Sequence, residues 1–312
     1  REYGAEGIGL CRTERMFNEK DRIKLFVKMI MAKEREEKQK ILEKLQKLQK
    51  SDFIGILKAM EGYKVTIRLL DPPLHEFLPS SKNKKVLARA KELEEVNPMM
   101  GHRGVRLGIT SPEIYEMQIK AVFEATADLV KKKINAKPQI MIPQVSSIAE
   151  LNHIKSIYDN VKSDMEKKYR IKFKINFGTM LEVVRACLTA NELADTAEFF
   201  SFGTNDLTQG VFSFSREDVE GKFLGDYMDK GLVEISPFQS IDKNGVGNLM
   251  KIGIKQGRVV QKNLEIGICG EHGGDPNSVK FCHSADVTYV SASPYRIPTA
   301  ILAAAQAVIE HK

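Results

Sequence analysis

Short apolar runs recur along the whole chain, and each is followed by polar residues and then by a segment with helical periodicity. An alternation of strand and helix predicts a parallel sheet with helices covering both of its faces. Seven parallel strands would form either an open doubly wound sheet or most of an eight-stranded barrel. The seven candidate strands are residues 7–11, 65–70, 140–143, 175–180, 199–203, 264–269 and 287–291.

The first residues of the chain favour the barrel over the open sheet. Arg1-Glu2-Tyr3-Gly4 has the form of a helix end with a glycine just past it, and a helix that closes a strand–helix unit implies a strand before it. We therefore predict an α/β fold, a (β/α)8 barrel of the TIM type whose first strand is missing from this chain. Because no low-complexity linker or internal repeat interrupts the sequence, we expect residues 1–312 to form a single domain. Helical patterns occupy residues 85–95, 112–133 and 147–168.

Composition argues against two classes of function. The 312 residues are 42% hydrophobic and 29% charged, which is typical of a globular protein. No apolar run approaches the ~20 residues of a membrane span, and no signal peptide is visible. The net charge of +7 raises the question of nucleic acid, but the lysines of residues 33–50 are interleaved with glutamates, and no aromatic and basic cluster occurs. We expect no membrane and no nucleic-acid partner.

The cysteine pattern indicates a reducing compartment. The four cysteines show neither a CxxC spacing nor a dense framework, so free thiols and a cytoplasmic location are expected. They are Cys11, Cys187, Cys269 and Cys282.

Charged and polar residues follow the predicted strands. In TIM-type barrels the active site lies at the carboxyl ends of the strands. Arg12, Arg68 and Arg103 at one rim would suit a phosphate group, because arginine binds phosphate through two nitrogens. Glu14 and Asp71 follow the same strands as Arg12 and Arg68. The alternative is a ring of salt bridges between the arginines and the acids of the rim.

Two carboxylates follow neighbouring strands. The segment FFSFGTNDLTQ, residues 199–209, places Asp206 just past a buried strand, where a charge needs solvent, a partner or a metal. The alternative is an ordinary turn, since glycine, asparagine and aspartate are common there. Glu182 precedes Asp206 by about one helix and one strand, so we expect both carboxylates at the same end of the sheet. Such a pair suits Mg²⁺.

Cys269 ends a predicted strand. A cysteine in an apolar run is usually a small core residue, and we interpret the other three cysteines in that way. A thiol at a strand end can instead act as a general acid or base. Glycines at 270, 273 and 274 would allow a ligand to approach the backbone, and Glu271 and His272 could hold a proton network.

Six segments carry a resemblance that covers essentially the whole chain. In order, they resemble the C-terminal domain of the pyruvate phosphate dikinases, which are phosphoenolpyruvate (PEP)-utilising enzymes. PEP synthase-like and enzyme I-like phosphotransferase barrels are the alternative, but LDPPLHEFLP, MMGHRG and CGEHGGDP resemble the dikinases more. The six segments are GIGLCRTERMF, RLLDPPLHEFLP, NPMMGHRGVRL, GTMLEVVRA, FFSFGTNDLTQ and GICGEHGGDP.

The resemblance implies a phosphotransferase whose barrel binds PEP and pyruvate. It exchanges a phosphoryl group with a phosphohistidine on another domain, and the overall reaction is ATP + phosphate + pyruvate = AMP + pyrophosphate + PEP. The phosphohistidine and nucleotide-binding domains are expected to lie outside residues 1–312, so this chain alone would support only the PEP/pyruvate half-reaction. A homodimer is also implied. A binding barrel without catalysis and a Mg²⁺-dependent lyase or aldolase are rival readings that the intact site motifs disfavour.

The resemblance also implies a role for each candidate residue. Mg²⁺ is the expected cofactor. Val184 departs from the family pattern, in which a proline is usual, and this affects only the expected loop after Glu182. The implied roles are Glu182 and Asp206 for the metal; Arg12, Arg68 and Arg103 for the phosphoryl group; Gly203, Thr204, Asn205 and Asp206 for the rest of the substrate; and Cys269 for the acid/base step.

Overall fold

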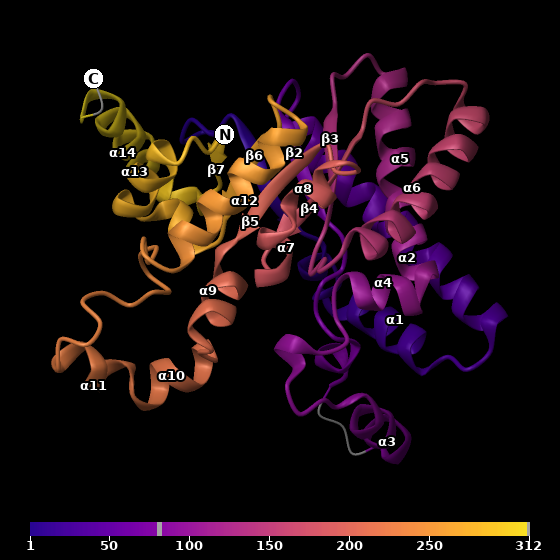
Figure 1. Ribbon diagram of the computed structural model, residues 1–312. Coiled ribbons are helices and arrows are strands. Elements are labelled where there is room, and N and C mark those ends of the chain that lie inside the picture. The colour runs from indigo at the N-terminus through magenta and orange to yellow at the C-terminus, as the bar shows by residue number, and fades with distance from the viewer. Residues whose placement is uncertain (80–82, 311–312) are drawn as a thin grey trace. The chain divides into compact units, whose positions relative to one another are not determined.

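A computed structural model describes residues 1–79 and 83–310 and shows an α/β fold (Figure 1). The strands belong to one sheet and follow each other in sequence order from β1 to β7. The described pairings are parallel. This is the strand order and direction of a TIM-type barrel, with seven strands instead of eight in the described residues. The predicted fold class is confirmed.

The strands lie close to their predicted positions. The last strand is shorter than predicted, although Ser291 still donates its N–H to the carbonyl of Ile268 at 2.9 Å. The strands are β1 (Gly7–Arg12), β2 (Lys64–Arg68), β3 (Lys137–Ile142), β4 (Asn176–Leu181), β5 (Phe199–Gly203), β6 (Glu265–Cys269) and β7 (Tyr289–Val290).

The three predicted helices are also found, each within two residues of its expected ends. None of the helices in the described residues has both the length and the apolar character that a membrane span requires. The α-helices are α1 (Lys20–Met31), α2 (Arg35–Ala59), α3 (Lys84–Leu93), α4 (Val105–Thr110), α5 (Pro112–Lys131), α6 (Ile148–Tyr169), α7 (Val184–Leu188), α8 (Ala190–Ala194), α9 (Thr204–Phe212), α10 (Arg216–Lys222), α11 (Leu224–Asp229), α12 (Val246–Val260), α13 (Pro276–Ser284) and α14 (Ile297–Glu310). Short 3₁₀ helices are η1 (Thr13–Phe17), η2 (Leu74–Phe77), η3 (Pro98–Met100), η4 (Glu271–Gly274) and η5 (Pro294–Arg296).

The reading of Arg1–Gly4 as a helix end was wrong. These residues form a turn, in which the N–H of Gly4 donates to the carbonyl of Arg1 at 2.9 Å. Gly4 has a φ of +91°, a backbone conformation that glycine adopts easily. The same conformation is common just past a helix, so the glycine in the sequence did not distinguish a turn from a helix end.

The chain divides into two compact units. The arginine unit consists of residues 11–144 and 149–176, and the cysteine unit consists of residues 1–10, 145–148 and 177 onward. The expectation that residues 1–312 work as a single functional domain stays a prediction.

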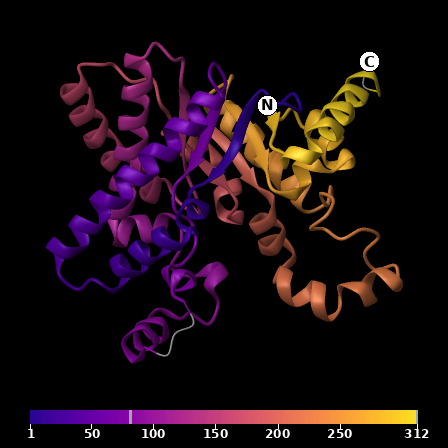
Figure 2. The ribbon, with the colours of Figure 1, turned by 180° about the vertical axis from the view of Figure 1, so that it is seen from behind.

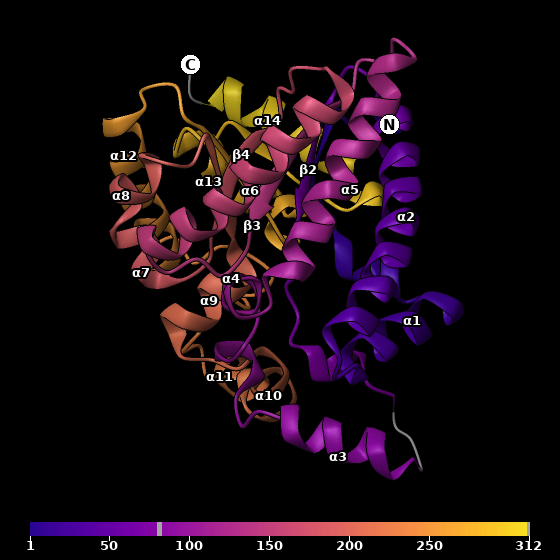
Figure 3. The ribbon, with the colours of Figure 1, turned by 90° about the vertical axis from the view of Figure 1, so that its right-hand side faces the viewer.

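In the arginine unit, β2 and β3 pair in parallel from Lys64↔Lys137 to Arg68↔Met141. Helices α2 and α5 pack side by side (Figure 3). Pro112 opens α5 and Glu113 lies in its first turn, both of which favour a helix start. The buried face of α5 includes Tyr115 and Gln118, which reach the end of β2.

In the cysteine unit, β5 is buried on both faces, and its phenylalanine side chains lie in the core. Phe199, Phe200 and Phe202 have no exposed surface, and β5 pairs with β6 so that Gly203 stands opposite Cys269. Helices α10 and α11 lie on a segment that extends away from the strands of this unit (Figures 1 and 2). That segment, residues 213–245, has a small core of its own around Phe238. The β5–β6 pairing positions the candidate site residues of this unit.

Two helix glycines should respond oppositely to alanine. A methyl group at Gly257 in α12 would lie 2.7 Å from Cε2 of Phe200, whereas no described atom lies within 4 Å of the same position at Gly55 in α2. We expect Gly257→Ala to lower the free energy of unfolding by about 1–3 kcal/mol through overpacking. Gly55→Ala should raise it by up to about 1 kcal/mol through helix propensity. Urea denaturation measures both, and equal effects would contradict the packing described.

Candidate active site

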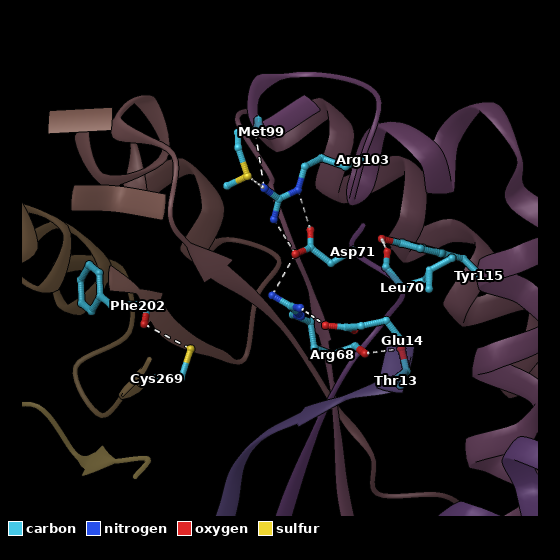
Figure 4. A network of polar contacts seen from close by, with 10 residues as sticks. All are labelled: Thr13, Glu14, Arg68, Leu70, Asp71, Met99, Arg103, Tyr115, Phe202 and Cys269. Atoms are coloured by element: carbon cyan, nitrogen blue, oxygen red, sulfur yellow. Dashed lines mark hydrogen bonds and ion pairs between the residues drawn. The ribbon is translucent and has the colours of Figure 1, made fainter. Parts of the chain in front are cut away.

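The backbone after β2 is held by side chains from η1 and α5. Thr13 Oγ1 donates to the carbonyl of Arg68 at 2.9 Å, and the Tyr115 hydroxyl donates to the carbonyl of Leu70 at 2.9 Å (Figure 4). The N–H of Leu70 donates to Oε1 of Gln118 at 2.8 Å. Leu70 has no exposed surface, so its backbone groups need such partners. This strand end is therefore held in place independently of its charged side chains.

Asp71 follows at once and joins two of the predicted arginines. Arg103 binds its carboxylate through two nitrogens, with Nε 3.2 Å from Oδ1 and Nη2 2.5 Å from Oδ2 (Figure 4). Arg68 approaches from the other side, with Nη1 2.9 Å from Oδ2 of Asp71. Arg68 also places Nη2 2.6 Å from Oε1 of Glu14. Arg68, Asp71 and Arg103 are all buried, at 7%, 2% and 6% exposure.

The arginines keep Asp71 ionised. Burial raises the pKa of Asp71, but the charges of Arg68 and Arg103, the hydrogen bond from Arg103 and the charge of Arg12 outweigh it. Together they hold the pKa below its usual value of 3.8. All three predicted arginines thus act on one carboxylate.

The salt-bridge alternative is correct in part. Arg68 and Arg103 are paired with acids, as the salt-bridge alternative predicts. Two carboxylates among three arginines still leave an excess of positive charge, which suits an anionic ligand. The sequence placed Asp71 at a strand end but did not single it out. Arg103, which binds Asp71 through two nitrogens, is 32 residues away in the chain, and no local pattern links the two residues.

In the cysteine unit, Glu182 lies against the end of β5. Glu182 is 3% exposed and follows β4, where Leu181 pairs with Phe202. A side chain at Gly203 would place its Cβ 2.5 Å from Oε2 of Glu182, closer than atoms can approach. Gly203 is therefore required for the carboxylate to lie over the β5 backbone. Asp206 follows in the first turn of α9.

Thr204 and Asn205 lie beside the end of β6. Thr204 is fully buried, and its Oγ1 lies 3.1 Å from the carbonyl oxygen of Cys269. The backbone of Gly270 passes over both side chains, since a Cβ there would lie 3.1 Å from Oγ1 of Thr204 and 3.4 Å from Oδ1 of Asn205. Oδ1 of Asn205 is buried and has no hydrogen-bond partner among the described residues. A buried polar atom without a partner in the protein calls for a hydrogen bond from a water or a ligand.

Cys269 stands directly opposite Gly203 in the β5–β6 register. It is 2% exposed, and its Sγ lies 3.4 Å from the carbonyl oxygen of Phe202. Burial raises the pKa of each of the other three cysteines to about 12, so those thiols stay protonated. Their burial agrees with the packing role expected for them.

His272 lies beside Thr204, whereas the ion pair described for Glu271 is with Arg216. The Nδ1 atom of His272 lies 2.6 Å from Oγ1 of Thr204, and its Nε2 lies 2.9 Å from the carbonyl oxygen of Pro237. The side chain of Glu271 is 58% exposed and forms an ion pair with Arg216 at 2.8 Å. The expectation that Gly273 leaves space for a ligand was wrong. A Cβ there would lie 2.0 Å from the carbonyl oxygen of Ser291, so this glycine serves chain packing.

Glu182 and Asp206 are the two predicted metal ligands. Among residues 1–79 and 83–310 no three or more histidine, cysteine, aspartate or glutamate side chains gather as a metal cluster. Glu182 and Asp206 offer hard oxygen donors near the adjacent ends of β4 and β5. Mg²⁺ fits such a pair, because it usually keeps several waters and takes only one or two protein carboxylates.

Residues 1–309 match the model of the family described as PEP-utilising enzyme, PEP-binding domain. The chain belongs to this family.

Curated relatives contain this PEP-binding domain as part of a longer chain. Pyruvate, phosphate dikinase from Entamoeba histolytica is 52% identical over 331 residues, which cover 99% of this chain and 37% of the relative. A chloroplastic pyruvate, phosphate dikinase from Arabidopsis thaliana is 50% identical, covering 99% of this chain and 34% of the relative. The Clostridium symbiosum dikinase is 48% identical, covering 99% and 37%. The chain thus spans just over a third of these relatives.

Removing the charge of Asp71 should destabilise the PEP-binding domain. Asp71→Asn keeps the side-chain volume but leaves two buried arginines without their shared anion, a kind of change that typically costs 3–5 kcal/mol. We expect a loss of about 3–5 kcal/mol in the free energy of unfolding at pH 7, measured with urea. Asp159→Asn is the control, because Asp159 is half exposed in an i,i+4 pair with Lys155 and should change stability by less than about 1 kcal/mol.

The stability that the Asp71 carboxylate contributes should depend on pH. The pKa of Asp71 is lower in the folded protein than its usual 3.8. Its contribution to the free energy of unfolding is therefore fully present above that pH, and it is lost as the pH falls through the lowered pKa of the folded protein. The stability difference between wild type and Asp71→Asn should stay constant from about pH 8 to about pH 5 and shrink only below about pH 4. A difference that already shrinks at about pH 6 would rule out an Asp71 pKa held below its usual value.

Proposed function

We propose that this chain is the PEP- and pyruvate-binding part of a pyruvate, phosphate dikinase. It moves a phosphoryl group between PEP and a phosphohistidine on another part of the enzyme, within the overall reaction ATP + phosphate + pyruvate = AMP + pyrophosphate + PEP. One observation carries the proposal: the β5–β6 register sets Cys269 beside the loop of Gly203, Thr204 and Asn205. The dikinase names of the relatives favour this over a PEP synthase-like or enzyme I-like barrel.

The arginines would bind the phosphoryl group. Arginine offers a planar, positively charged set of donors that matches a phosphate group, and Asp71 holds Arg68 and Arg103 by buried ion pairs. A cation held in place before the substrate arrives needs no reorganisation during the reaction.

Glu182 and Asp206 would hold Mg²⁺. When bound, the ion supplies positive charge to the oxygen that becomes negative as the P–O bond of PEP breaks. Glu182 contributes a carboxylate that is kept out of bulk water over Gly203. Asn205 and the backbone near Gly203 and Thr204 would receive the substrate carboxylate.

Cys269 would move the proton. When the phosphoryl group leaves PEP for the histidine nitrogen, the enolate that remains takes a proton from the Cys269 thiol at its methylene carbon and becomes pyruvate. In the reverse direction the thiolate removes that proton. A free thiol is needed, and all four cysteines are buried and unbridged, which also supports the proposed reducing, cytoplasmic setting.

The proposed homodimer has a candidate surface on α14. Ala300, Ala303 and Ala307 are buried within the cysteine unit, so the alanines pack the helix onto its own unit. The other face exposes Ile301, Leu302, Val308 and Ile309 at 46–72%. We expect Leu302→Glu together with Ile309→Glu to convert a dimer to a monomer in sedimentation experiments, because both place charge on this apolar face. A wild-type chain that sediments as a monomer at micromolar concentration would rule out the dimer.

Cys269→Ala should separate binding from proton transfer. We expect the wild-type chain to bind PEP in calorimetry only when Mg²⁺ is present, and the variant to bind it equally well. Exchange of the pyruvate methyl hydrogens with D₂O should fall by about 10²–10⁴-fold, the usual cost of losing a general acid or base. Cys282→Ala is the control, because Cys282 is equally buried but lies in α13. Normal exchange in Cys269→Ala would assign the proton to another group, and Mg²⁺-independent binding would overturn the metal assignment.

A further inference from the structure

His272 is a buried titratable group that the proposed mechanism does not use. It has no exposed surface, and both of its ring nitrogens lie within hydrogen-bond distance of oxygen atoms. One partner is Thr204 at the start of α9, and the other is the carbonyl of Pro237 in the segment of residues 213–245. A single side chain therefore joins the candidate substrate loop to that segment.

The direction of these hydrogen bonds follows from their chemistry. A carbonyl oxygen only accepts, so Nε2 of His272 carries the hydrogen that points to Pro237. Burial lowers the pKa of His272 below its usual value, although the Pro237 carbonyl, Asp275 and Glu271 oppose this and Arg216 adds to it. The ring is then neutral with one N–H, and Nδ1 is an acceptor.

Thr204 must supply the hydrogen to that acceptor. A hydroxyl group has one hydrogen, and Oγ1 of Thr204 lies 2.6 Å from Nδ1 of His272 and 3.1 Å from the carbonyl of Cys269. With Nδ1 as acceptor, the hydrogen points to His272 at the shorter distance. This fixes the rotamer of Thr204, the first residue of α9.

The first turn of α9 carries the groups assigned to the substrate. Asn205 follows Thr204 directly, and its Oδ1 is buried without a partner among the described residues. The backbone of Gly270 lies against both side chains, so a shift of Thr204 would move the surface that Asn205 presents.

We propose that His272 is a positioning residue, whose ring accepts from Thr204 and donates to Pro237 and so holds Asn205 in the geometry that binds the substrate carboxylate. This inference rests on the proposed function. A purely structural role would instead depend on the bond to Pro237, which anchors the segment of residues 213–245. The two bonds use different ring nitrogens and can be removed one at a time.

Two substitutions separate the bonds. His272→Asn places an acceptor oxygen near the position of Nδ1 but has no group at Nε2, and His272→Gln places a donor near Nε2 but no acceptor at Nδ1. We expect His272→Gln to raise the Kd for PEP, measured with Mg²⁺ present, by roughly tenfold, the effect of about one hydrogen bond. His272→Asn should stay within about twofold of wild type. At saturating pyruvate, methyl-hydrogen exchange should change less than about twofold in both variants, because Cys269 is intact.

A higher Kd for His272→Asn than for His272→Gln, or equal Kd values in the two variants, would overturn the positioning role. Nitrogen NMR of the imidazole in the wild-type protein tests the same claim without any variant that needs to fold. We expect the neutral tautomer with its hydrogen on Nε2 at pH 7, and a hydrogen on Nδ1 would overturn the proposal. Failure of the wild-type protein to bind PEP at all would overturn the proposed function, and this inference with it.

Discussion

The parallel register of β4, β5 and β6 is the constraint on which the candidate residues of the cysteine unit depend. In a parallel pair, residues that end neighbouring strands lie at the same edge of the sheet, however far apart they are in the chain. Gly203 and Cys269 are opposite each other for this reason, although a long stretch of helix and loop separates them. The same geometry sets Leu181 opposite Phe202 and so brings Glu182 to Gly203. A slip by one residue would turn each of these side chains to the other face.

Buried charge is the second requirement of the site. A carboxylate removed from water is costly unless charges and hydrogen bonds compensate it. Asp71 meets that requirement with two arginines, and the backbone around it is held by Thr13, Gln118 and Tyr115. The arginines are thereby held in one geometry, which is what a site for a phosphoryl group needs. Under the proposed function, the paired acid orders the arginines for the phosphoryl group.

The four cysteines show how the surroundings of a residue separate side chains of one type. Cys11, Cys187 and Cys282 are buried thiols whose pKa is raised to about 12, and they serve packing. Cys269 is as buried, but it ends a strand beside a glycine-containing loop with an unsatisfied amide oxygen. The neighbours of a thiol therefore matter more to the proposed chemistry than its burial does.

Local patterns in the sequence were enough for the fold class and for most of the candidate residues. Strand and helix periodicity depends on near neighbours, and the motifs after each strand marked Arg12, Arg68, Glu182, Asp206 and Cys269. The tertiary structure alone decided which of these groups meet. The bidentate pairing of Arg103 with Asp71, the contact of His272 with Thr204 and the packing role of Gly273 all join residues that are distant in the chain or packed across elements. Such contacts leave no periodic signal, because they arise only when separate strands and loops are packed together.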